Sequence, residues 1–412
     1  MRFRQVSRRG LAEILSAPSA GAIREWEGRT TVKTPELAVI VNSYGKISHG
    51  DCIATKLLEG LAFLDRVDPP RCKVVSMNLV EKAADDIGEA LAKKHGVELH
   101  HTIATTLCRG GDRLAVDGAV VIGEHGTYPF NAKGQHLYPR REQFDQVAGV
   151  FRQSGRVVPV FNDKHLCWNW EWARYMWRTI GELKIPYMAG SSLPYAPFDP
   201  KVDLPRGKPI DHVIAVGYAG LESYGFHALE TGQFVAEQRP GGETGVRAVQ
   251  CLSGADVWKA HESGRWPRDI AAAALAAVHT PNGRPQDHTR DVHAFDIEYR
   301  DGQRMTVLMA NGYCSEFGFA YRLKGSPEIR ATAYKLDPYP RRLHFSALVR
   351  SIEDMFLTGK PTEPAERTLL TTGMLSYLVE SQARGGVRLE TPDLDISYAA
   401  PRRPEAWREV LR

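Results

Sequence analysis

The feature that most constrains the fold is an alternation of short apolar strands and helices in the first half of the chain. Residues 37–42 (LAVIVN) predict a buried strand, and residues 52–66 carry apolar side chains at helical spacing. The same alternation continues through predicted strands at 73–78, 97–99, 118–123 and 157–161 and predicted helices at 84–95, 141–154 and 168–183. Strands rich in β-branched residues that alternate with helices indicate a parallel sheet covered on both faces. Ligands of such sheets bind beyond the carboxyl ends of the strands.

The second half of the chain follows a different pattern. Asp301-Gly302 predicts a hairpin turn between strands at 293–299 and 304–310. Further elements are expected as a strand at 316–322 and helices at 224–237, 254–278, 341–357 and 364–384. We therefore expect an α/β protein of two domains, with a proline-rich connection after residue 190. Residues 1–190 would form a Rossmann-like domain with a parallel sheet, and 191–412 an α+β domain with an open, mainly antiparallel sheet.

Composition excludes several classes of protein. A net charge of +4 over 412 residues is too small to favour nucleic acid or membrane binding. No stretch approaches the roughly 18 apolar residues of a membrane helix. Arg8-Arg9 near the start is followed by no apolar run of signal-peptide length, which argues against export. The six cysteines are widely spaced, as expected of reduced, buried thiols. We expect a soluble, cytoplasmic protein.

Polar side chains follow two strands of the predicted parallel sheet. Glu124 and His125 come directly after one strand, as potential metal ligands or acid/base groups, unless they form a solvated loop. Asp163, Lys164 and His165 follow another strand. An ordinary helix cap would explain Asp163 but neither of the two residues after it. Both strand ends are therefore candidate catalytic positions.

The second candidate group lies in the second half of the chain, on a predicted helix and in the loop that precedes it. His227 and Glu230 are three residues apart on a predicted helix and share one face, and Glu222 precedes that helix. A helical histidine satisfied by its neighbour is the simpler alternative. Arg140 and Arg141 could hold an anionic group or simply face solvent.

Four tryptophans lie on the helix predicted at 168–183. Core or interface packing is the expected role of such a cluster, and a platform for stacking sugars is the functional alternative.

The turn after the first strand lacks the usual dinucleotide motif. A pyrophosphate needs a G-x-G-x-x-G turn so that it can approach the backbone at a helix start. Here Gly45 and Gly50 are five apart, with bulky and charged residues between them. Glu81 is a poorly placed candidate for a ribose-binding acid. Both observations argue against tight NAD binding.

These residues give the chain a remote resemblance, over nearly its whole length, to the glucose–fructose oxidoreductase/inositol dehydrogenase (Gfo/Idh/MocA) family. Asp163-Lys164-His165 stands where that family usually has Glu-Lys-Pro, and His227-Ala228-Leu229-Glu230 is similar to its His-x-x-Asp helix. The resemblance implies that Lys164 is a pocket lysine and His227 the catalytic acid/base. It also implies NAD(P)-dependent hydride transfer on sugars or polyols, and dimers or tetramers formed through the open sheet.

The missing glycine motif and the gathering of ionisable groups favour a different chemistry on that fold. The leading hypothesis is a non-redox lyase, hydrolase or isomerase acting on a sugar- or polyol-derived small molecule. Its catalytic residues would be Lys164, His227 and Glu230, with no nicotinamide site. A divalent Mn, Zn or Fe ion would be held by some of Glu124, His125, Asp163, His165, Glu222 and His227. The alternatives are an NAD(P)-dependent sugar or polyol oxidoreductase and a non-catalytic ligand sensor.

Overall fold

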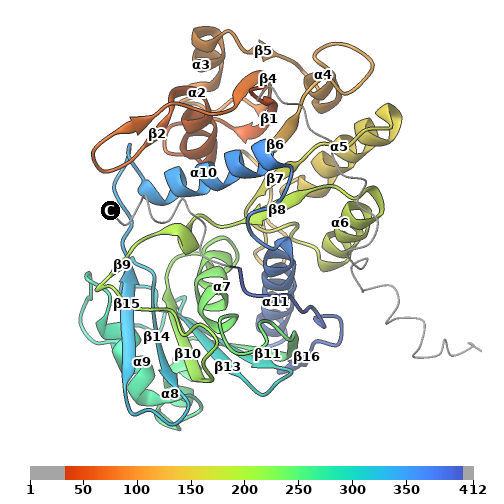
Figure 1. Ribbon diagram of the computed structural model, residues 1–412. Coiled ribbons are helices and arrows are strands. Elements are labelled where there is room, and N and C mark those ends of the chain that lie inside the picture. The colour runs from red at the N-terminus through yellow and green to blue at the C-terminus, as the bar shows by residue number, and fades with distance from the viewer. Residues whose placement is uncertain (1–32, 402–412) are drawn as a thin grey trace, which may run out of the picture. The chain divides into compact units, whose positions relative to one another are not determined.

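The strands of the first half form a six-stranded parallel sheet in the order β5-β4-β1-β6-β7-β8 (Figure 1). The structure is a computed structural model that describes residues 33–401, so the Arg8-Arg9 segment lies outside the described residues. The strands are β1 (Glu36–Ser43), β4 (Lys73–Glu81), β5 (Glu98–Leu99), β6 (Gly118–Ile122), β7 (Val160–Asp163) and β8 (Tyr187–Gly190). This is the strand order of doubly wound dinucleotide-binding folds. The predicted Rossmann-like sheet is confirmed.

The helices of this half differ from prediction mainly at one boundary. They are η1 (Asp51–Thr55), α2 (Lys56–Glu59), α3 (Gly88–His95), α4 (Ile103–Cys108), α5 (Arg140–Ser154) and α6 (Trp170–Leu183). The helix predicted to reach residue 66 ends at Glu59, because Gly60 has a φ of +112°. The chain then forms a short hairpin of β2 (Leu61–Ala62) and β3 (Val67–Asp68).

The second half contains an eight-stranded sheet in the order β16-β11-β12-β13-β10-β14-β15-β9. Its strands are β9 (Phe198–Asp199), β10 (Ile210–Gly217), β11 (Val246–Ser253), β12 (His293–Tyr299), β13 (Arg304–Met309), β14 (Gly318–Leu323), β15 (Ile329–Tyr334) and β16 (Leu389–Glu390). Only the β10–β13 pair is parallel among the pairs of this sheet in the described part of the chain. The mainly antiparallel sheet predicted from the sequence is therefore confirmed.

Both faces of this second sheet are covered by the chain's own helices. One face packs against α7 (Ser223–Ala236) and α11 (Ala365–Ala383), and the other against α9 (Arg268–Ala276). The two faces alternate along β10, where Val213 belongs to one core and Ile214 to the other.

The helix predicted at 254–278 is wrong as a single helix. It is two helices, α8 (Ala255–Glu262) and α9, because Gly264 has a φ of +77° and Pro267 precedes α9. Two short 3₁₀ helices, η2 (Leu193–Tyr195) and η3 (Pro285–Asp287), complete this half.

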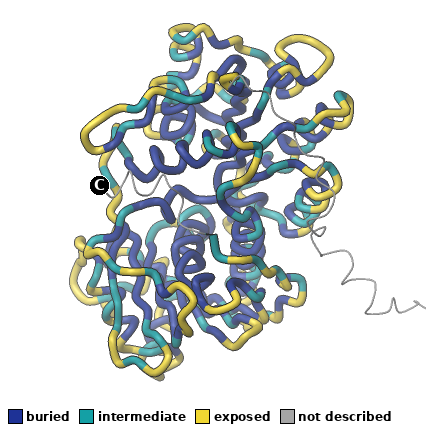
Figure 2. Tube along the Cα trace, viewed as in Figure 1, coloured by how far each residue is buried: buried dark blue, intermediate teal, exposed yellow. Residues whose placement is uncertain are grey.

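The helix α10 (Leu343–Thr358) belongs to the second half of the chain but packs against elements of the first half, namely η1, α2 and β2. Ser346 Oγ donates a hydrogen bond to the carbonyl of Ala62 at 2.6 Å. A Cβ placed on Gly118 of β6 would lie 2.4 Å from the ring of Phe356. Figure 2 shows α7, α10 and α11 largely buried. The division at residue 190 remains a sequence-based prediction.

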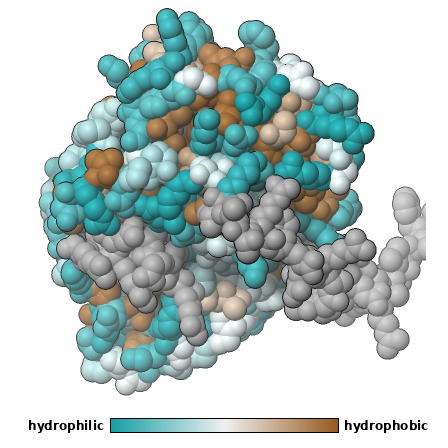
Figure 3. All heavy atoms as spheres, turned by 45° about the horizontal axis from the view of Figure 1, so that its top comes forward, coloured by the Kyte–Doolittle hydropathy of each residue, from teal (hydrophilic) through white to brown (hydrophobic). Residues whose placement is uncertain are grey.

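On the face shown in Figure 3, hydrophobic residues lie among hydrophilic ones. All six cysteines are buried and free, as predicted. None of the helices in residues 33–401 is long and apolar enough to cross a membrane.

Candidate active site

Three adjacent strands of the parallel sheet end at the candidate site. His49 stands in the turn after β1, Glu124 follows β6 by two residues, and Asp163 is the last residue of β7. Because β1, β6 and β7 are neighbours and parallel, their carboxyl ends meet at one edge of the sheet. The site therefore lies where the sheet topology places ligands.

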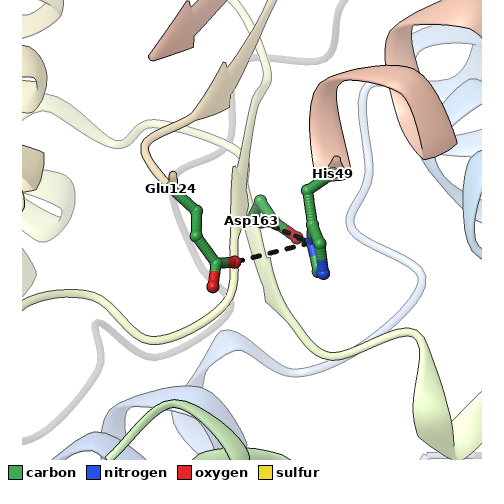
Figure 4. Close-up of side chains that lie close together, drawn as sticks. All are labelled: His49, Glu124 and Asp163. Atoms are coloured by element: carbon green, nitrogen blue, oxygen red, sulfur yellow. Dashed lines mark hydrogen bonds and ion pairs between the residues drawn. The ribbon is translucent and has the colours of Figure 1, made fainter. Parts of the chain in front are cut away.

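The three side chains point toward one another (Figure 4). His49 Nδ1 donates to the Asp163 carboxylate, at 2.9 Å from Oδ1 and 2.8 Å from Oδ2. It lies 3.7 Å from Glu124 Oε2. One ligand atom from each residue falls within 4.8 Å of the other two, and this is the one such group in the described residues. A histidine nitrogen with two carboxylate oxygens is a donor set for Mn, Zn or Fe(II).

Lys164 gives the site a second charged contact. Its Nζ lies 2.5 Å from Glu124 Oε1, and both side chains are buried. Burial raises the pKa of Glu124, but Lys164 and then His49 outweigh it and hold that pKa well below its usual range. The other oxygen, Oε2, accepts no hydrogen bond. A charged, buried oxygen without a donor faces His49, and a cation there would satisfy it.

The backbone at the site is strained. Lys164 has a φ of +61° and His125 a φ of +64°, in the left-handed region that non-glycine residues seldom adopt. The Lys164 amide donates to the carbonyl of Gly190 at the end of β8, at 3.2 Å. Such strain costs on the order of 1–3 kcal/mol and gathers at functional sites.

His227 approaches the same site from α7. Its ring centroid lies 6.1 Å from that of His49, and its Nδ1 is 2.6 Å from Ser191 Oγ. Burial, followed by the charges of Lys164 and His49, holds the pKa of His227 well below its ordinary value. The imidazole is therefore neutral at pH 7 and can accept a proton during a reaction.

Glu230 lies one turn further along α7 and contacts Ser191, the hydrogen-bond partner of His227. Its carboxylate accepts from the Ser191 amide at 3.5 Å and from Thr371 Oγ1 at 2.7 Å. Burial raises its pKa. Glu230 contacts the Ser191 amide, and the predicted catalytic role of Glu230 stays a prediction.

His165 and Glu222 form a separate group with Arg140. Arg140 Nη1 donates to His165 Nε2 at 3.0 Å, and His165 Nε2 lies 3.7 Å from Glu222 Oε1. Burial and then Arg140 lower the pKa of His165, so the ring is neutral. Of the six predicted metal ligands, Glu124 and Asp163 come together around His49. The placement of His125, His165, Glu222 and His227 leaves their ligand roles as predictions.

The two arginines of the 140–141 pair have different environments. Arg140 is buried, whereas Arg141 pairs with Asp145 at 3.3 Å and covers the ring of Trp172. Trp168 and Trp172 pack edge to face, 4.9 Å apart, beside the main core.

Sequence reasoning missed His49 as a ligand and Ser191 as the partner of His227. The signal for His49 is its position, because it begins the helix after β1, the place that faces the other strand ends. Ser191 carries no local signal, since it meets His227 only through the packing of β8 against α7.

The turn after β1 does not fit a dinucleotide pyrophosphate. The amide of Lys46 donates to Asp85 Oδ2 at 3.0 Å, and that of Ile47 to Asp51 Oδ2 at 2.9 Å. The amide of Asp51 itself is capped by Ser48 Oγ at 3.2 Å. These three amides therefore donate to side chains, and two of the acceptors are carboxylates, which would repel a phosphate placed there. Gly50 has close neighbours in β1 and in the turn, because its Cβ would lie 2.8 Å from Val41 and 3.3 Å from Ser48 Oγ.

The fold resembles that of several solved enzymes. It is similar to GenD2 from gentamicin A biosynthesis in complex with NAD, at 16% identity and a TM-score of 0.55, covering 89% of this chain and 98% of that one. It is similar to scyllo-inositol dehydrogenase from Lactobacillus casei with bound NAD(H) and scyllo-inositol, at 12% identity and a TM-score of 0.55, covering 87% and 99%. A myo-inositol dehydrogenase from Corynebacterium glutamicum ATCC 13032 gives 15% identity and a TM-score of 0.53, covering 87% and 100%.

No protein-family model matches the chain, and no curated protein matches it. At these identities the solved structures establish the fold and nothing finer. The chain shares its fold with these solved structures, two of which are inositol dehydrogenases, as expected from the resemblance drawn from its sequence.

Proposed function

We propose that this chain is an enzyme that acts on a sugar- or polyol-derived small molecule by non-redox acid–base chemistry assisted by a divalent metal ion. The observation that carries the proposal is the group of His49, Glu124 and Asp163, with a charged Glu124 oxygen that no donor satisfies. The inositol named for two of the fold neighbours supports the substrate class. The turn after β1, whose backbone amides already donate to side chains, supports a reaction without a nicotinamide.

The residues of the site would have different roles, which follow from their charges. His49, Glu124 and Asp163 would hold the ion, which supplies Lewis acidity or a more acidic bound water. Lys164 is the proton donor nearest the ligand group, and the neutral His227 is the acceptor opposite it. Ser191 holds the ring of His227 at a fixed angle, and α7 and the surrounding core exclude water.

The test is metal content together with a ligand variant. Purified protein should bind about one Mn²⁺ or Zn²⁺ per chain, measured by elemental analysis and calorimetry after chelator treatment. His49→Gln should weaken that binding at least tenfold, because the site loses the imidazole nitrogen, one of its three ligand atoms. His95→Gln is the matched control, since His95, at the end of α3, pairs with Glu59 of α2 and lies outside the ligand group. Equal metal binding by wild type and His49→Gln would reject the metal site.

An NAD(P)-dependent sugar or polyol dehydrogenase is the second candidate. It is favoured by the fold neighbours, two of which are described with NAD or NAD(H) bound. Fluorescence titration with NADH and NADPH decides between the two. Saturable binding at micromolar cofactor would replace the non-redox proposal, whereas no binding at millimolar cofactor would remove the dehydrogenase.

A further inference from the structure

We propose that Arg140 is the anchor for an anionic group of the substrate, carboxylate or phosphate, so that the substrate is an acidic sugar derivative rather than a neutral one. This inference rests on the proposed function, because it names the class of the molecule bound at that site.

The first argument is the unusual isolation of a buried charge. Arg140 is 1% exposed, and its Nε and Nη2 donate no hydrogen bond. Within residues 33–401 it forms no ion pair, and its polar side-chain partner is the ring of His165. A buried cation without a hydrogen-bonded counter-charge is costly, and guanidinium groups are suited to bidentate binding of carboxylate and phosphate.

The second argument is a comparison with the other buried arginines. Arg239 pairs with Glu243 at 3.1 Å and with Asp301 at 2.6 Å. Arg367 pairs with both Glu237 and Glu363 at 2.7 Å. Arg350 likewise contacts two carboxylates. The fold thus gives its other buried arginines acidic partners, and Arg140 is the exception.

The third argument is location. Arg140 begins α5, directly after the loop that carries Glu124, and its guanidinium lies 4.9 Å from the ring centroid of Tyr138. Its contact, His165, is the residue next to Lys164 in the chain. Arg140 therefore contacts the residue that directly follows the proposed acid–base lysine in the chain.

Glu222, which lies 3.7 Å from the same His165, also has an unpaired oxygen. Its Oε1 accepts no hydrogen bond, whereas its Oε2 accepts from the His136 amide at 2.7 Å. A molecule with both an anionic group and hydroxyls would supply an acceptor to Arg140 and a donor to Glu222. A hydroxyl of a neutral sugar could also accept from Arg140, but without the charge that strengthens such a hydrogen bond.

The experiment is calorimetric titration of the full chain with D-glucuronate, D-glucose 6-phosphate and D-glucose, which differ in the anionic group. We expect wild-type protein to bind at least one of the two anions about 10- to 100-fold more tightly than D-glucose, the range for a charged hydrogen-bonded contact. The better of the two identifies carboxylate or phosphate. Equal affinities, or binding of D-glucose alone, would overturn the inference.

Variants assign the effect to Arg140. Arg140→Gln should abolish the preference for the anion, and Arg140→Lys should keep part of it. Arg141→Gln, which alters the neighbouring, partly exposed arginine, is the control and should keep the wild-type preference. If Arg140→Gln does not fold, as judged by circular dichroism, the wild-type comparison still decides. A preference that persists in a folded Arg140→Gln variant would overturn the assignment. Metal binding is measured in parallel, so that wild-type protein with no anion preference but intact Mn²⁺ binding rejects only this inference.

Discussion

At the scale of single residues, Lys164 is the side chain on which the charges of the site depend. It is buried, has a left-handed backbone and pairs with Glu124, whose carboxylate would otherwise be raised in pKa by burial. Removing one partner of a buried pair costs much more than removing both, because the remaining charge has no compensation.

Lys164→Met should therefore lower the free energy of unfolding by about 3–5 kcal/mol, measured by urea denaturation. The double variant Lys164→Met with Glu124→Gln should recover most of that loss. Lys82→Met, which breaks the exposed pair with Glu89, should change the free energy of unfolding far less, because solvent screens that pair. Additive losses in the double variant would show that Lys164 and Glu124 do not interact.

Residue identity at this site was only partly predictable from the sequence. Glu124, Asp163 and Lys164 could be named because strand ends of a parallel sheet converge. His227 could be named because it shares a helix face with Glu230 and matches a motif of the family that the chain resembles. The contact between His227 and Ser191 could not, because it depends on how far α7 is rotated against β8. For the same reason, the sequence did not indicate that His165 and Glu222 meet Arg140 rather than His49.

At the scale of elements, the contact of α10 with β6 depends on a glycine, which has no side chain to block it. Gly118 begins β6, and a Cβ there would lie 2.4 Å from Phe356 and 2.9 Å from Leu37. The strand has no room to move, since β6 is paired on both sides.

Gly118→Ala should therefore destabilise the protein by about 1–3 kcal/mol, the range for overpacking a core. Gly149→Ala is the matched control, because Gly149 lies exposed inside α5 with nothing within 4 Å of its Cβ position. That change should stabilise by about 0.5–1 kcal/mol, as expected in a helix interior. Thermal denaturation of both variants measures the two signs, and a neutral Gly118→Ala would contradict the close contact.

Element boundaries show what periodicity can and cannot predict. The strands at 293–299 and the helix at 364–384 match the structure within about two residues, because long regular patterns dominate there. The helix at 254–278 was predicted across Gly264 and Pro267, since its apolar positions stay in phase on both sides of the break.

At the scale of the whole molecule, buried histidines make stability depend on pH. Burial lowers the pKa of His344 to about 3 and that of His212 to about 4. An unfolded chain binds these protons near its ordinary value of about 6.5. Because the folded pKa is the lower one, the stabilisation is present above pH 6.5 and is lost as pH falls toward the folded values.

Between pH 7 and pH 5, each such histidine should cost about 2 kcal/mol of unfolding free energy. His344→Gln should reduce the acid sensitivity by that amount, measured by urea denaturation at both pH values. His279→Gln is the control, since His279 is about half exposed. An unchanged difference between the two pH values in His344→Gln would contradict a neutral, buried His344.

The return of α10 to the first sheet has a consequence for synthesis on the ribosome. The strands of that sheet are all translated by Gly190, but the helix that carries Ser346 and Phe356 emerges much later. Until then, the apolar surface around Gly118 has no native cover. The nascent first half must therefore wait, partly folded, for the last third of the polypeptide, and this is the interval in which chaperones would bind it.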